Sequence, residues 1–82
     1  MDNTIDEKIK NVMSLVFEVP IEEINENASP DIIKSWDSLK HMNLVIALEE
    51  EFDCEFTDSE AVELLNFKLI LVTIKEYVEK QN

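Results

Sequence analysis

Apolar residues recur with helical spacing in four stretches of the chain. The first stripe comprises Ile5, Ile9, Val12, Met13 and Val16. Its members follow the i, i+4, i+7, i+8 and i+11 pattern of one helix face, which predicts a helix over about residues 5–17. Thr4 and Glu7 match the Ser/Thr-x-x-Glu capping box and mark the expected start of this helix.

A second helix is predicted after Asp37, whose side chain suits the N-cap position. We expect it to run to about Glu51 and to end at the break formed by Asp53 and Cys54. At about 100° per residue, this helix has two apolar faces. The face expected in the core comprises His41, Leu44, Val45, Leu48 and Phe52. The other face comprises Leu39, Met42 and Ile46, flanked by Asn43, Glu49 and Glu50.

Two further helices complete the pattern. Thr57 and Glu60 form a second capping-box match, which predicts a short helix over about residues 58–65. Asn66 is a candidate N-cap for the last helix. The apolar stripe of that helix comprises Phe67, Ile70, Leu71, Ile74 and Val78. Because no stretch alternates with strand period for long enough to build a sheet, the sequence predicts an all-α fold: a small four-helix bundle with three main helices and one short helix.

The segment from Val19 to Trp36 is polar and is interrupted by Pro20 and Pro30, so we expect a long first loop. A connection longer than ~15 residues in a small domain is usually functional or pinned by its own side chains. The expected pins are the isoleucines of this segment: Ile21, Ile24, Ile32 and Ile33. Since the chain contains no glycine, no loop can hold phosphate through a glycine-rich turn.

The length of 82 residues allows one domain with one modest core, so we expect residues 1–82 to form a single domain. A formal net charge of −12 argues against nucleic acid and anionic membranes as partners and favours partners with basic patches. The acidic side chains also repel one another within the folded chain. We therefore expect the stability to be modest and to rise with salt.

Several features favour the cytoplasm. No apolar stretch approaches the ~20 residues needed to span a bilayer, and the first residues are acidic rather than those of a secretory signal. The lone Cys54 allows no internal disulfide and no multi-cysteine metal site, which agrees with a reducing compartment. We assign Cys54 no role beyond that of a small, partly buried apolar residue, and we expect no built metal site.

Ser38 is the candidate functional residue. It falls in the first turn of the second helix, where unpaired N–H groups and the positive end of the helix dipole favour an anion. A phosphodiester on its hydroxyl would be stabilised there; the alternative is an ordinary capping serine. Similarly, the face of Leu39, Met42 and Ile46 is either a docking surface beside Ser38 or is covered by the third helix or the long loop.

Acidic residues gather after this face. Eight of the 19 acidic residues fall between Glu49 and Glu63, with no Lys or Arg among them. Such a run is often only a solvated surface. Its position beside the second apolar face favours a role in steering basic partners.

Three segments resemble the acyl carrier protein family. They are Asp37-Ser38-Leu39, the helix end Ala47-Leu48-Glu49-Glu50-Glu51-Phe52, and the closing Ile74-Lys75-Glu76-Tyr77-Val78. The similarity extends over nearly the whole chain, through the amphipathic first helix and the long loop. The triplet alone is a weak motif, but its position in this helix order makes it specific.

The resemblance implies a function for each matching position. In that family the serine of the triplet carries 4'-phosphopantetheine, whose thiol holds an acyl or aminoacyl group as a thioester, and Ser38 is the matching residue. Asp37 matches the aspartate associated with recognition by the phosphopantetheinyl transferase. The positions that face partner enzymes are matched by Leu39, Met42, Ile46 and Glu49. We therefore expect a monomeric carrier, without catalysis of its own, that serves acyl-loading and acyl-accepting enzymes.

Some positions depart from the family pattern. Carriers of fatty acid synthesis usually have a glycine shortly before the triplet, whereas this chain has Ser35 and Trp36. Lys40 stands where an acidic residue is common, and Lys34 lies nearby, so the charge around Ser38 is less negative than usual. With Trp directly before the triplet, the chain resembles carriers that serve specialised pathways, such as surface glycan or secondary metabolite assembly.

Trp36 and His41 occupy the N' and N4 positions around the Asp37 cap, which is the geometry of a hydrophobic staple. We expect the indole to pack against the imidazole or its neighbours. The alternative, in which His41 acts as a base on Ser38, lacks an orienting partner in the motif.

Two other classes of function compete with a carrier. A small serine hydrolase using Ser38 and His41 lacks the G-x-S-x-G turn and evident oxyanion donors. An acidic helical interaction module without a prosthetic group remains the alternative, although the glycine-containing calcium loop is absent from the sequence. Such a module would tolerate Ser38→Ala, and a carrier would not.

Overall fold

The computed structural model describes the backbone of residues 2–81 and the side chains of residues 5–80. This part of the chain forms four α-helices and one 3₁₀ turn: α1 (Asp2–Phe17), η1 (Ile21–Glu23), α2 (Ser38–Phe52), α3 (Asp58–Glu63) and α4 (Phe67–Gln81). No strand occurs among these residues. The predicted all-α fold, with three main helices, one short helix and a long first loop, is confirmed.

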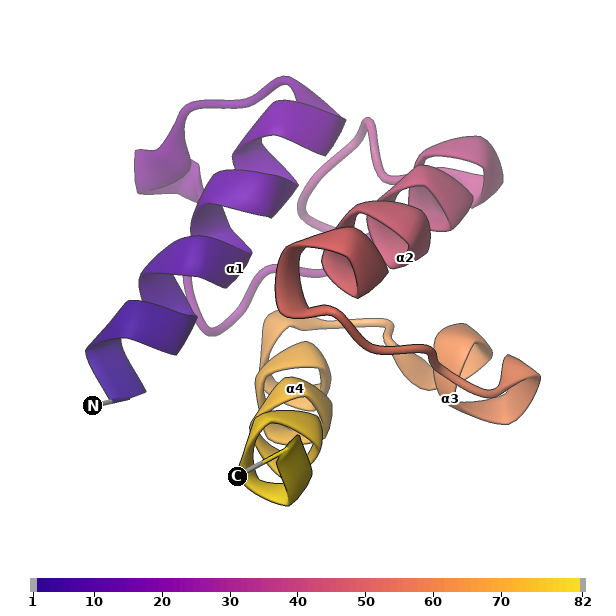
Figure 1. The fold of residues 1–82 in the computed structure, drawn as a ribbon. Coiled ribbons are helices and arrows are strands. Elements are labelled where there is room, and N and C mark those ends of the chain that lie inside the picture. Colours follow the sequence, from indigo (N-terminus) through magenta and orange to yellow (C-terminus); the bar gives the residue numbers. More distant parts are fainter. Residues whose placement is uncertain (1, 82) are drawn as a thin grey trace.

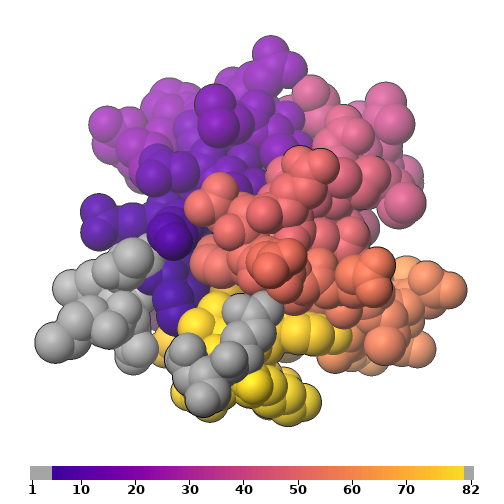
Figure 2. All heavy atoms as spheres, in the orientation of Figure 1, coloured from indigo at the N-terminus to yellow at the C-terminus, as the bar shows by residue number. Residues whose placement is uncertain are grey.

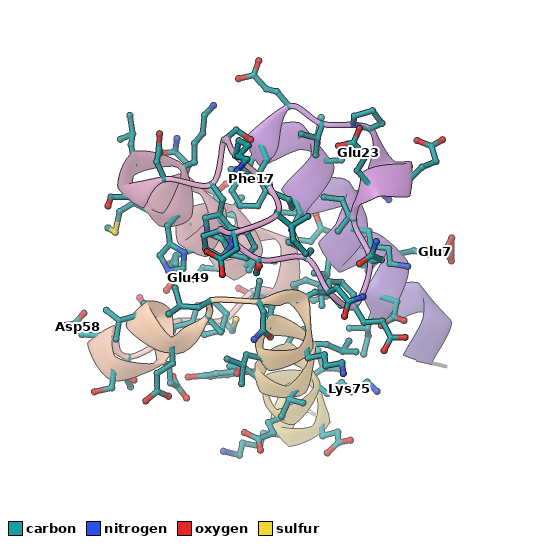
Figure 3. All side chains as sticks on the ribbon, turned by 180° about the vertical axis from the view of Figure 1, so that it is seen from behind. Glu7, Phe17, Glu23, Glu49, Asp58 and Lys75 are labelled. Carbon is teal, nitrogen blue, oxygen red and sulfur yellow. The ribbon has the colours of Figure 1, made fainter. Side chains whose placement is uncertain are left out.

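The helices surround one apolar core. α1 packs against both α2 and α4, and α3 lies to the side, next to the first half of α2 (Figure 1). With all heavy atoms drawn, the surfaces of α1 and α2 meet and α4 lies beneath them (Figure 2). The buried apolar residues are Ile9, Val12, Met13, Phe17, Ile24, Ala28, Ile33, Trp36, Leu44, Val45, Leu48, Phe52, Leu64, Phe67, Ile70 and Ile74. Phe17 points inward from the end of α1, whereas Glu7 and Asp58 point away from the interior (Figure 3).

Local caps set most helix boundaries. Asp37 is the N-cap of α2, Thr57 and Glu60 form a complete capping box on α3, and the Asn66 side chain accepts the Leu69 N–H at 2.8 Å at the start of α4. These three predictions are confirmed. The predicted end of the third helix at residue 65 is wrong, because the backbone leaves the helix at Leu64, whose side chain turns into the core.

The start of α1 was also predicted incorrectly. The helix begins at Asp2 rather than near residue 5, so Thr4 lies within the first turn and is not the N-cap. The Thr4 side chain lies outside the described residues. An aspartate in a first turn is favourable with respect to the helix dipole, which is a physical reason for the earlier start.

In the absence of glycine, other residues take the left-handed conformation at helix ends. Glu18 follows α1 with φ 59°, and Asp53 is the C-cap of α2 with φ 53° and ψ 55°. Aspartate tolerates this region better than most residues because its short polar side chain can bond locally. Both helices therefore terminate sharply without a glycine.

The long loop is pinned by only two of the four predicted isoleucines. Ile24 and Ile33 are buried, but Ile21 and Ile32 are exposed, so the prediction is wrong for these two. Ala28 and Trp36 are buried in their place. Backbone contacts explain the path: the Phe67 N–H donates to the Ala28 carbonyl at 3.1 Å, and Ser35 Oγ donates to the Phe17 carbonyl at 2.8 Å.

Candidate functional site

Ser38 is exposed in the first turn of α2. The Asp37 carboxylate accepts the Lys40 N–H at 2.9 Å, and the first intrahelical bond joins the His41 N–H to the Asp37 carbonyl at 2.8 Å. The N–H groups of Ser38 and Leu39 precede that bond and have no carbonyl partner within the helix. The hydroxyl of Ser38 therefore lies at the electropositive end of α2.

Lys40 forms an ion pair beside this turn. Its Nζ lies 2.9 Å from Glu18 Oε2, and the Lys40 side chain is mostly covered whereas that of Glu18 is exposed. The hydrogen bond and charge of Lys40 lower the pKa of the Glu18 carboxyl. The positive charge of Lys40 is thus partly offset by a residue that follows α1, which the sequence pattern did not indicate.

The second apolar face of α2 is exposed. Leu39, Met42 and Ile46 keep 70%, 56% and 50% of their surface in solvent. On the opposite face, Leu44, Val45, Leu48 and Phe52 are buried as predicted, while His41 is half-buried. The alternative in which α3 or the long loop covers the second face is therefore wrong. We call Leu39, Met42 and Ile46 the α2 ridge.

Glu49, the acidic residue predicted beside this ridge, is half-buried. Its Oε2 accepts the Phe56 N–H at 2.9 Å, and its carbonyl accepts the Cys54 N–H at 3.1 Å. The side chain therefore extends from α2 to the segment that leads into α3. Glu49 therefore also organises the connection between the two helices, whereas Asn43 and Glu50 are exposed near the ridge.

An open groove of about 530 Å³ lies beside Ser38. It is lined by Pro30, Trp36, Asp37, Ser38, His41, Met42, Val62 and Leu65. Val62 and Leu65 are 65% and 50% exposed, so apolar surface continues from the α2 ridge onto α3 and the residues after it. The sequence did not predict that Val62 and Leu65 lie beside Ser38, because a helix of barely two turns has too few apolar positions to define its buried face.

Trp36 and His41 are joined by a hydrogen bond as well as by packing. The indole Nε1–H donates to His41 Nδ1 at 3.1 Å, and the two rings stack with centroids 6.2 Å apart. His41 Nε2 lies 2.8 Å from the Ala61 carbonyl and therefore carries the ring hydrogen. The predicted contact is confirmed. Since both ring nitrogens are engaged away from Ser38, the geometry gives no support to His41 as a base.

Cys54, which follows the opposite end of α2, is half-buried. Burial raises the pKa of its thiol, and the negative charges of Glu49, Asp53 and Glu60 raise it further. The thiol is therefore protonated at neutral pH and a poor nucleophile.

Within the described residues, no group of three or more His, Cys, Asp or Glu side chains is arranged to hold a metal ion. None of the helices described is long and apolar enough to cross a membrane.

Comparison with known proteins finds similarity to an acyl carrier protein. The chain is 40% identical over 62 residues to a protein named acyl carrier protein from Buchnera aphidicola subsp. Schizaphis graminum (strain Sg). The matched region covers 76% of this chain and 78% of that relative. No family model matches the chain.

Proposed function

The chain belongs to the acyl carrier protein family, and we propose that it carries an acyl or aminoacyl group as a thioester on a 4'-phosphopantetheine arm attached to Ser38. When bound, the arm supplies a thiol for the thioester and the reach to present the cargo to partner enzymes. The chain's own residues position the arm, and we assign them no catalytic step. We further propose that residues 1–82 act as one carrier domain, as a monomer in the cytoplasm.

The observation that carries this proposal is the position of Ser38. Its side chain is exposed in the first turn of α2 and at the edge of an apolar groove. Helix N-termini favour phosphate because their N–H groups point toward it and the helix dipole attracts negative charge. These features fit a phosphodiester on the hydroxyl with an arm that begins in solvent.

The residues around Ser38 have separate roles in the proposal. Asp37 caps α2 through the Lys40 N–H and presents an exposed carboxylate to the phosphopantetheinyl transferase. Lys40 contacts Glu18 at 2.9 Å and supports the junction between the end of α1 and the start of α2. Both contacts hold the first turn in place while the hydroxyl is modified.

We propose the α2 ridge, with Glu49 beside it, as the surface that docks on acyl-loading and acyl-accepting enzymes. Its apolar side chains are at least half exposed, and the chain has 19 acidic residues against seven basic ones. An apolar centre with an acidic margin suits a partner that presents an apolar patch framed by Lys and Arg.

The test is intact mass after incubation with coenzyme A, magnesium and a broad-specificity phosphopantetheinyl transferase. We expect a gain of one phosphopantetheinyl group, lost in Ser38→Ala. Ser59→Ala is the matched control, because Ser59 is also exposed in the first turn of a helix, α3. No gain in the unaltered chain, or an equal gain in Ser38→Ala, would overturn the proposal in favour of an interaction module without a prosthetic group.

A further inference from the structure

α3 buries little of its own apolar surface, and two polar contacts join it to its neighbours. None of the residues of Asp58–Glu63 is buried, and the nearest buried residue is Leu64, directly after the helix. On one side the His41 Nε2–H donates to the Ala61 carbonyl at 2.8 Å. On the other side the Tyr77 hydroxyl donates to Glu60 at 2.5 Å. Ala61 is partly buried against the core, so the position of α3 beside α2 depends on this contact, on Leu64 and on the two hydrogen bonds.

The contact at His41 is part of a longer series. Trp36 donates to His41 Nδ1 and also stacks on Phe17 at the end of α1, with ring centroids 4.7 Å apart. Trp36 is only 5% exposed, so its own position is well determined by the core. We call the Trp36 indole, the His41 imidazole and the Ala61 carbonyl the latch. It connects the end of α1, the long loop, α2 and α3.

The latch lies between the groove and the core. Trp36 and His41 line the groove beside Ser38. Leu44 follows His41 by about one helical turn, Leu64 follows Ala61 by a similar step, and both leucines are buried at 0% and 1% exposure. An apolar chain that starts at Ser38 lies at the edge of the open groove. The route from this groove to Leu44 and Leu64 that passes between α2 and α3 crosses the latch.

We propose that His41 is a specificity-determining residue that keeps the apolar part of the cargo in the external groove and out of the helical core. For the natural cargo this rests on the proposed function of Ser38. The groove volume of about 530 Å³ lies within the usual range for small-molecule sites, so acyl groups short enough to lie between Met42, Val62 and Leu65 are the class it suits. Separating α3 from α2 would break the hydrogen bond between the His41 Nε2–H and the Ala61 carbonyl, which disfavours that route.

The experiment places an alkyl chain at position 38 without relying on the natural modification. Ser38→Cys in a Cys54→Ser background is alkylated with N-octyl iodoacetamide, so that the thiolate sulfur forms a carbon–sulfur bond and iodide leaves. Methyl and indole NMR resonances are compared before and after alkylation. We expect shifts at Met42, Val62, Leu65 and the Trp36 indole, and none at the core reporters Leu48 and Ile74.

Three variants in this background isolate the role of His41. In His41→Val, which has no donor or acceptor, we expect alkylation to shift the Leu48 and Ile74 methyls. In His41→Gln, the side-chain amide has both an acceptor and a donor group and can replace the imidazole, so we expect alkylation to leave the Leu48 and Ile74 methyls unshifted. Tyr77→Phe is the matched control, because it removes the hydrogen bond between α3 and α4. Alkylation of this variant should also leave the Leu48 and Ile74 methyls unshifted.

Several results would overturn the inference. They are core shifts in the parent protein, an octyl chain that stays in the groove in His41→Val, and core shifts in Tyr77→Phe equal to those in His41→Val. Should His41→Val not fold, His41→Leu, which also lacks a donor to the Ala61 carbonyl, is expected to produce the same core shifts. Because alkylation needs no transferase, a negative mass experiment on Ser38 would refute the carrier function and leave the result on the latch standing.

Discussion

The phenolic hydroxyl of Tyr77, on α4, donates a 2.5 Å hydrogen bond to the Glu60 carboxylate, on α3. Glu60 also completes the capping box of α3 by accepting the Thr57 N–H at 2.9 Å. One carboxylate therefore stabilises the start of α3 and joins it to α4. The Tyr77 ring is held from another side by Phe56, which packs edge-on with centroids 5.4 Å apart.

This contact predicts a pH dependence. The hydrogen bond to Glu60 raises the pKa of Tyr77 from 10.0 to about 12. A raised pKa contributes stability that is complete below the unfolded value and is lost as the pH rises through the folded value. The stability of the protein relative to Tyr77→Phe should therefore fall between pH 10 and about 12. Chemical denaturation of both proteins across this range measures the difference.

The single tyrosine gives an independent check. Ultraviolet titration of its ionisation should give a pKa near 12 in the native chain, and Glu60→Gln should lower it toward 10.0. An ordinary tyrosine titration in the native protein would show that the hydrogen bond does not persist in solution.

His41 provides hydrogen-bond partners for two groups, the Trp36 Nε1–H and the Ala61 carbonyl. Replacing it by Ala removes the acceptor for the Trp36 Nε1–H and the imidazole donor to the Ala61 carbonyl. We expect a loss of about 1–3 kcal/mol in the free energy of unfolding and a red shift of the fluorescence of the only tryptophan. Asn43→Ala, at an exposed position on the same helix, is the control and should change neither. Unchanged emission in His41→Ala would argue against the contact.

Asp37 combines a structural and a proposed functional role that two substitutions can separate. Asp37→Ala removes the acceptor for the Lys40 N–H and should cost ~1 kcal/mol of stability. Asp37→Asn keeps the cap, because Asn is an equally good N-cap residue, but removes the charge. We expect Asp37→Asn to retain the stability and to slow arm installation. Equal installation rates for Asp37→Asn and the native chain would show that the carboxylate is not recognised.

The α2 ridge is expected to matter for docking and little for folding. Ile46→Ala should change the free energy of unfolding by no more than about 0.5 kcal/mol, because the side chain is half exposed. It should weaken binding to an acyl-transferring partner enzyme, measured by calorimetry. Leu15→Ala is the matched control, since Leu15 is an exposed apolar residue on α1. Equal losses in both variants would indicate that the ridge has no special role.

Salt should stabilise this chain. With a net charge of −12, repulsion between acidic residues opposes the compact state, and added ions screen it. Salt also weakens the attraction between Lys40 and Glu18, but Glu18 is exposed and such pairs contribute little. We therefore expect the Tm to rise with sodium chloride concentration, as followed by circular dichroism. A Tm that stays constant or falls would contradict the role given to charge repulsion.

The sequence by itself determined the features that depend on near neighbours. Asp37, Thr57 and Asn66 act as caps through groups three residues away, and the buried face of α2 follows from residues spaced three or four apart. Such contacts form within one or two helical turns whatever the rest of the chain does, so periodicity and capping chemistry were enough to predict them. The exposed ridge follows from the same spacing, because a helix with two apolar faces in so small a bundle buries only one.

Only the tertiary structure decided the features that join remote segments. The loop has no helical period, so the sequence could not distinguish the buried Ile24 and Ile33 from the exposed Ile21 and Ile32. The bond from His41 to the Ala61 carbonyl spans 20 residues, and the groove brings Val62 beside Ser38. These contacts depend on the direction that the chain takes after each helix, at Glu18 and Asp53. A change in the backbone angles at either residue would move the next segment relative to the helix before it. Local sequence preference determines which residues form each helix, while packing around the shared core determines which side chains of different helices come into contact.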